Sequence, residues 1–85
     1  MTEADILLRA KAFIVENFMY MRKNKDLGDN DSLLNSGVIS SLGMIEVVAW
    51  IQESFGVSVD PVDITEENFD TAQSMARFVA RKVGT

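Results

Sequence analysis

The first apolar pattern in the chain predicts a helix from about Glu3 to Tyr20. On a wheel of 3.6 residues per turn, apolar residues gather on one side and charged residues lie opposite. The apolar side consists of Leu7, Ala10, Ile14, Phe18 and Met21, and the charged side of Asp5, Arg9 and Glu16. This segregation is typical of a helix that buries one face.

The segment after this helix loses the helical pattern and is predicted to be a long loop. Residues 22–30 are polar and include Gly28. Residues 31–37 keep loop-forming residue types but also contain Leu33 and Leu34. Because a long loop in a small domain needs apolar anchors, we expect these two leucines to attach it to the core.

A second helix is predicted from Ser41 to about Phe55, with Ser40 as its N-cap and Gly56 as its stop. Its expected buried stripe consists of Met44, Val47, Val48, Ile51 and Phe55. Its opposite side mixes apolar residues with carboxylates: Leu42, Glu46, Ala49 and Glu53, with Trp50 at the margin. Such a mixture favours a docking surface. The alternative is that Trp50 packs against a loop.

The C-terminal third predicts an extended segment followed by two more helices. Residues 57–62 are expected to be extended, with a break at Asp60 and Pro61. Thr65 is a good N-cap for a short helix, with Ile64 and Phe69 at the two ends of a hydrophobic staple. A last helix, capped by Asp70 or Thr71, is expected to reach about Lys82. Its predicted inner face is Ala72, Met75, Ala76, Val79 and Val83, with Arg77 and Arg81 outside.

These elements predict an all-α fold. We expect a small antiparallel bundle of three main helices plus one short helix, with a long loop between helices 1 and 2. The length favours one domain over residues 1–85. No apolar run is long enough to span a membrane, and the N-terminus lacks the layout of a signal peptide. A cytoplasmic protein without membrane insertion is therefore expected.

The charge of the chain is unevenly distributed. The net charge is −5, yet no Lys or Arg occurs between Asp26 and Asp70. Ten acids lie in this acidic block: Asp26, Asp29, Asp31, Glu46, Glu53, Asp60, Asp63, Glu66, Glu67 and Asp70. All eight basic residues lie outside it. This distribution disfavours nucleic-acid binding and favours a basic protein partner, although a solvated acidic surface would have the same composition.

The residue types argue against an enzyme. The chain contains no Cys and no His, which excludes a thiolate nucleophile, an imidazole base and a zinc site of the common kind. Glu66 and Glu67 are adjacent at a helix start and point apart, so they cannot form an acid/base pair. We therefore expect no catalytic residues and no metal site, and a small hydrolase is a remote alternative.

One segment still places chemistry at a defined position. Residues 37–43 read GVISSLG and carry the hydroxyl of Ser41 to the point where the long loop enters the second helix. A helix N-terminus has unpaired N–H groups and a positive dipole end, which suit a phosphate. From these residues alone, Ser41 could hold a phosphoryl group, or both serines could simply be caps.

At this point the chain resembles the acyl carrier protein family, and more narrowly the discrete acyl and aminoacyl carriers, including D-alanyl types. The resemblance covers nearly the whole chain. It is strongest in SLLNSGVISSLGMIEVVAWIQESFGVSV and in DITEENFDTAQSMARFV. The resemblance implies that Ser41 receives 4′-phosphopantetheine from coenzyme A through a separate magnesium-dependent phosphopantetheinyl transferase. The thiol of the arm then carries an acyl or aminoacyl group as a thioester.

The resemblance also implies partners. A loading ligase and a downstream transferase would use basic patches of their own to dock on the second helix of the carrier. The carrier itself is expected to be a monomer. The residues that match this recognition helix are Leu42, Ile45, Glu46, Ala49 and Glu53, and we expect Trp50 to contact partners as well. Trp50 stands where the family usually has a small residue, which indicates a specialised carrier with its own partners.

The chain departs from the family at one position. The family motif is D-S-L, whereas the matching triplet here is Ser40-Ser41-Leu42. Serine caps helices about as well as aspartate, so the fold is expected to tolerate the change. In the family, this aspartate is expected to help the transferase recognise the motif. Its replacement leaves an alternative function, an unmodified helical adaptor that binds a partner through helix 2. A literal D-S-L occurs at Asp31 to Leu33, and we predict that it only turns the loop and anchors it.

Overall fold

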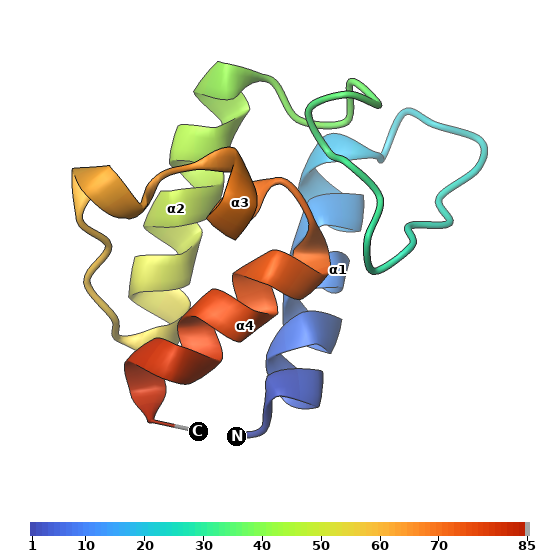
Figure 1. Ribbon diagram of the computed structural model, residues 1–85. Coiled ribbons are helices and arrows are strands. Elements are labelled where there is room, and N and C mark those ends of the chain that lie inside the picture. Colours follow the sequence, from blue (N-terminus) through green and yellow to red (C-terminus); the bar gives the residue numbers. More distant parts are fainter. Residues whose placement is uncertain (85) are drawn as a thin grey trace.

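The computed structural model describes residues 1–84, so residue 85 of the predicted domain lies outside it. Within this range the chain is helical and has no strand, which confirms the predicted all-α bundle. The helices are α1 (Glu3–Phe18), α2 (Ser41–Phe55), α3 (Glu66–Phe69) and α4 (Ala72–Val83), with a 3-10 turn, η1, at Pro61–Asp63. Helices α1 and α2 run in opposite directions, and α4 crosses them at a slant (Figure 1).

Helix α1 begins with a capping box between Thr2 and Asp5. The pKa of the Asp5 carboxyl lies below its usual value, mainly because the carboxylate accepts a hydrogen bond from the Thr2 backbone N–H. A second hydrogen bond, from the Thr2 hydroxyl, lowers this pKa further. The buried residues of the helix are Ile6, Ala10 and Ile14. The prediction that the helix reaches Tyr20 was wrong by two residues. Because the chain turns after Phe18, Met19 is buried and Met21, expected inside, is 86% exposed.

Helix α2 begins and ends where the sequence predicts. The Ser40 Oγ accepts a hydrogen bond from the Gly43 N–H at 3.1 Å, and Gly56 ends the helix with φ of 65°. The helix buries Met44, Val47, Val48 and Ile51, while Phe55 is half-buried. The predicted inner stripe is therefore confirmed for its first four residues.

The C-terminal elements differ from the prediction in detail. Thr71, not Asp70, caps α4. Val83, expected inside, is 41% exposed, whereas Phe78 and Ala80 are buried although they lie off the predicted stripe. The buried arc of α4 is wider because the helix contacts α1, α2 and α3. Residues 61–63 form the turn η1 instead of continuing the extended segment, because Pro61 starts a helical turn well.

Aromatic side chains connect α1 and α2. The Trp50 ring stacks on Phe13 with centroids 4.4 Å apart, and Phe55 meets Trp50 edge-on at 5.4 Å. The Arg9 guanidinium lies 4.7 Å from the centroid of the Phe55 ring. Trp50 thus packs against a helix, which neither sequence interpretation of this residue anticipated.

The loop of residues 19–40 is attached to the core at several points. Leu33 is 0% exposed, Val38 and Ile39 are buried and Leu34 is half-buried, which confirms the role predicted for the leucines. Asp29 pairs with Lys11 at 2.8 Å and its carbonyl accepts from the Gln73 N–H. These contacts hold the loop against the helices up to Ile39, just before α2 begins.

Candidate functional site at the start of helix α2

Ser41 is the first residue of α2, and its side chain is exposed. The preceding residue, Ser40, has extended backbone angles (φ −83°, ψ 170°), and its side chain is occupied by the cap to Gly43. The Met44 N–H donates to the Ser40 carbonyl at 3.0 Å. Over residues 1–84, no group accepts from the N–H of Ser41 or Leu42, and the Ser41 hydroxyl has no partner. Two donors at the positive helix end and one unpaired hydroxyl can thus face an incoming group together.

Gly43 allows this helix start to pack closely. A Cβ at this position would lie 3.1 Å from Ile39 Cγ2 and 3.1 Å from Phe18 Cε1. With contacts that short, Ile39 and Phe18 would have to move by a few tenths of an ångström. Glycine in the S-L-G run therefore allows the first turn of α2 to pack closely against α1 and the end of the loop.

A groove of about 240 Å³ opens beside Ser41. Its walls come from α2, the loop and the α3 region: Leu34, Ser41, Met44, Ile45, Ile64, Thr65, Glu66 and Phe69. Five of these side chains are apolar, and Ser41, Thr65 and Glu66 are polar. The groove can accommodate an apolar portion of a group attached to Ser41. Sequence reasoning missed it because its walls come from three separate segments.

The predicted docking residues on α2 do not all share one environment. Leu42 and Ile45 are 78% and 63% exposed, and Glu46, Ala49 and Glu53 are also exposed. Trp50 is half-buried by its stack on Phe13. We call the five exposed residues the α2 face. It combines two apolar side chains near Ser41 with two carboxylates.

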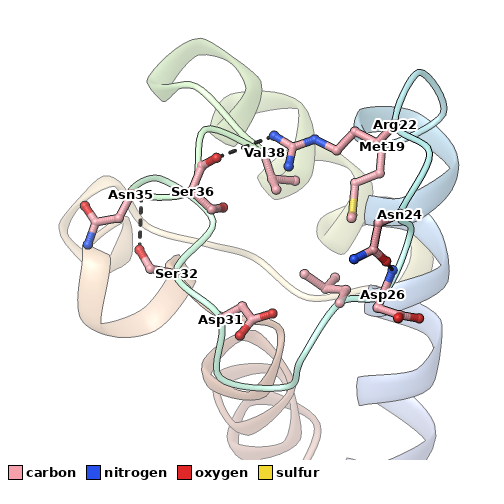
Figure 2. A pocket seen from close by; sticks show the side chains of 10 residues that line it. Met19, Arg22, Asn24, Asp26, Asp31, Ser32, Asn35, Ser36 and Val38 are labelled. Carbon is pink, nitrogen blue, oxygen red and sulfur yellow. Dashed lines mark hydrogen bonds between the residues drawn. The ribbon is translucent and has the colours of Figure 1, made fainter.

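A second hollow, of about 420 Å³, lies within the loop (Figure 2). Several of its polar groups have partners inside the protein. The Arg22 guanidinium donates to the Ser36 carbonyl at 3.4 Å, and the Asp31 carboxylate accepts from the Gly28 N–H at 2.7 Å. We therefore assign these groups to loop structure. Ser32, of the literal D-S-L triplet, lines this hollow and not the groove beside Ser41.

The carboxylates of the α2 face take part in no ion pair among residues 1–84. Among the described residues, the salt bridges are Lys11 with Asp29 and Lys82 with Asp63 at 3.7 Å, and neither includes Glu46 or Glu53. The part of the chain that is described also has no cluster of three or more metal-binding side chains. Among residues 1–84, Glu46 and Glu53 of the α2 face therefore form no ion pair.

Comparison with known families gives this geometry a context. The family of the phosphopantetheine attachment site matches residues 14–79, which include Ser41, the α2 face and the groove. The chain belongs to this family of carrier proteins. The match confirms the family expected from the sequence and covers most of the fold.

Two curated relatives give the same assignment. The D-alanyl carrier protein of Abiotrophia defectiva is 31% identical over 52 residues, which are 61% of this chain and 66% of the relative. Aminoacyl carrier protein 2 of Bradyrhizobium diazoefficiens is 28% identical over 60 residues, 71% of this chain and 66% of the relative. The matched segments thus span just under two thirds of either relative. As for membranes, none of the helices in residues 1–84 has the length and apolarity needed to cross one.

Proposed function

We propose that this carrier protein holds an acyl or aminoacyl group as a thioester on a 4′-phosphopantetheine arm attached to Ser41, and delivers it to partner enzymes. One observation carries the proposal. Ser41 lies inside the family match and presents an exposed, unpaired hydroxyl at the first residue of a helix.

The residues around Ser41 fit such an arm. The N–H groups of Ser41 and Leu42 suit a phosphate oxygen, and the groove offers Met44 and Ile45 to an apolar segment. The arm would supply a thiol, which this chain lacks because it has no cysteine. Carrier domains are generally not catalytic, and with neither Cys nor His the chain leaves the transfer chemistry to its partners.

The cargo we favour is an aminoacyl group. Both relatives are named for carrying one, D-alanyl in one case and aminoacyl in the other. The groove beside Ser41 has a volume of about 240 Å³, which suits a small cargo better than a long acyl chain. A ligase that activates an amino acid is therefore the loading partner we expect.

The partners should dock on the α2 face, with Trp50 at its margin. Its apolar centre, Leu42 and Ile45, lies next to Ser41, and Glu46 and Glu53 add negative charge. Complementary charge steers association and fixes register. The phosphopantetheinyl transferase, the ligase and a downstream transferase would each bring a basic patch to this surface.

Intact mass spectrometry tests the attachment. The purified protein is incubated with coenzyme A, Mg²⁺ and a broad-specificity phosphopantetheinyl transferase. We expect one arm on the wild type, none on Ser41→Ala, and one at the endpoint on Ser32→Ala, the matched serine of the other triplet. An arm that persists in Ser41→Ala would place the attachment elsewhere.

One observation favours a second candidate, the unmodified adaptor: Ser40 replaces the family's aspartate. The adaptor predicts that the protein purified from its own cell has the mass of the bare chain. It also predicts that Ser41→Ala retains all partner binding and all cellular function. Both results together would replace the carrier proposal.

A further inference from the structure

Asp70 connects the loop to the α3–α4 junction through three hydrogen bonds. Its Oδ2 accepts from the Ser32 hydroxyl at 2.6 Å, and its Oδ1 accepts from the Leu34 N–H at 3.0 Å. Its backbone carbonyl accepts from the Leu33 N–H at 2.8 Å. We call these three bonds the Asp70 clasp. Because Thr71 caps α4, the carboxylate of Asp70 is available for this tertiary role.

The clasped segment fixes the path of the chain to Ser41. The Leu33 carbonyl accepts from the Ile39 N–H at 3.1 Å, which closes residues 33–39 into a compact turn. The Ser32 hydroxyl also accepts from the Asn35 N–H at 3.1 Å (Figure 2). Ile39, buried at the end of this turn, immediately precedes Ser40. Asp70 thus holds the base of the turn that leads into α2.

The clasp also spans the groove beside Ser41. Leu34, whose N–H donates to Asp70, lines one wall, and Phe69, which directly precedes Asp70, lines another. Phe69 is fully buried, so it gives the clasp a fixed base. Loss of the carboxylate would release Leu34 while leaving Phe69 in place.

We propose that Asp70 is a positioning residue for the modification of Ser41, an inference that rests on the proposed function. It does not touch the reacting hydroxyl. It keeps residues 33–41 in one conformation, so that a transferase meets a preformed surface. Without the clasp, only a fraction of molecules would present that surface. The apparent affinity for the transferase would fall by the same fraction, which raises KM for the carrier and leaves kcat nearly unchanged.

Four variants separate positioning from charge and from folding. Asp70→Ala removes both carboxylate acceptors. Asp70→Asn keeps an oxygen for the Leu34 N–H and can donate an amide hydrogen to Ser32, so it should rescue the clasp. Ser32→Ala removes one bond. Asp29→Asn is the control, because Asp29 makes the same kind of loop anchor to Lys11 but lies outside the groove.

Two measurements are made on each variant. Amide hydrogen exchange on the unmodified protein reports whether Leu33, Leu34 and Ile39 lose protection while the α2 amides near Trp50 keep theirs. Initial rates of arm transfer give kcat and KM. For Asp70→Ala we expect selective loss of protection and about a tenfold rise in KM, the value if a tenth of the molecules stay ordered. Asp70→Asn and Asp29→Asn should stay within about twofold of the wild type because their junctions remain ordered.

The outcomes distinguish the two proposals. Wild-type KM in Asp70→Ala, together with lost protection at Leu34, would overturn the positioning role while Ser41 remains the attachment site. If all amides of Asp70→Ala lose protection, the variant is unfolded and Ser32→Ala takes its place as the test. An unchanged KM in Ser32→Ala would then overturn the positioning role. If the wild type accepts no arm, the proposed function fails first, and the positioning role fails with it.

Discussion

Two similar triplets, Asp31-Ser32-Leu33 and Ser40-Ser41-Leu42, have opposite environments in this fold. Ser32 donates to Asp70 and Leu33 is 0% exposed, whereas Ser41 has no side-chain partner among residues 1–84 and Leu42 is 78% exposed. The first triplet uses its side chains to hold the loop. The second leaves its last two side chains to solvent, where an enzyme or a partner can reach them.

The first residue of each triplet accounts for the difference. The Asp31 carboxylate accepts from the Gly28 N–H, three residues earlier, and closes a turn. The Ser40 hydroxyl accepts from the Gly43 N–H, three residues later, and opens a helix. After Ser40, the side chains of Ser41 and Leu42 are exposed, whereas after Asp31, Ser32 is half-buried and Leu33 is buried. The two triplets therefore differ in local structure although their letters are similar.

The two leucines should show the largest contrast in stability. Leu33→Ala creates a cavity in the core and should lower the free energy of unfolding by about 2–5 kcal/mol. Leu42→Ala removes an exposed side chain and should change it by less than about 0.5 kcal/mol. Urea denaturation of both variants followed by circular dichroism measures the pair. Equal losses would show that the two triplets do not differ in burial as described.

Local signals explain what could be predicted of this contrast. Ser40 and Gly56 mark the ends of α2 because capping depends on residues close in sequence. The same reasoning placed Ser41 at a helix start and attached the loop through Leu33. The end of α1 was misjudged because the apolar Met19 and Met21 continue the helical pattern past the point where the chain turns.

The rest of the site depends on contacts between distant segments. Asp70 had a plausible local role as a cap, and only the fold shows that its carboxylate binds Ser32 and the Leu34 N–H. The groove likewise requires α3 to lie beside the start of α2. Trp50 lay at the margin of an outward face by pattern, but Phe13 covers one side of its ring. A helical wheel describes one helix at a time and cannot report a neighbour.

The two serines should differ next, by a smaller amount. Ser32→Ala leaves an acceptor of Asp70 unpaired in a partly buried position, so it should cost about 1–3 kcal/mol of stability. Ser41→Ala removes a hydroxyl without a partner and should cost less than about 0.5 kcal/mol. Thermal melts of the unmodified proteins compare them. A stable Ser32→Ala protein would mean that the Asp70–Ser32 bond contributes little to holding the loop.

Exchanging the residue before the serine tests the departure from the family motif. Ser40→Asp restores D-S-L at the α2 start and should change stability by no more than about 0.5 kcal/mol, because both residues cap helices well. We expect a faster initial rate of arm transfer by a broad-specificity transferase. Ser40→Ala is the control: it loses the bond to Gly43 and should cost about 1 kcal/mol. Equal transfer rates for Ser40→Asp and the wild type would show that Ser40 does not limit modification.

The smallest expected effect concerns the charges around the two triplets. Near the first, Asp29 pairs with Lys11 and Asp31 accepts from Gly28, whereas Glu46 and Glu53 on the α2 face have no ion-pair partner among the described residues. Added salt should therefore screen more repulsion than attraction. A gain of about 0.5 kcal/mol corresponds to a rise of about 2–4 °C in the melting temperature of a domain this size.

Two variants test this salt response. Glu46→Gln combined with Glu53→Gln should weaken it, because the double change removes repulsion before salt is added. Asp29→Asn should strengthen it, because it removes the attraction to Lys11 that salt would otherwise weaken. A melting temperature independent of salt in all three proteins would show that the acids of the α2 face are solvated without mutual repulsion.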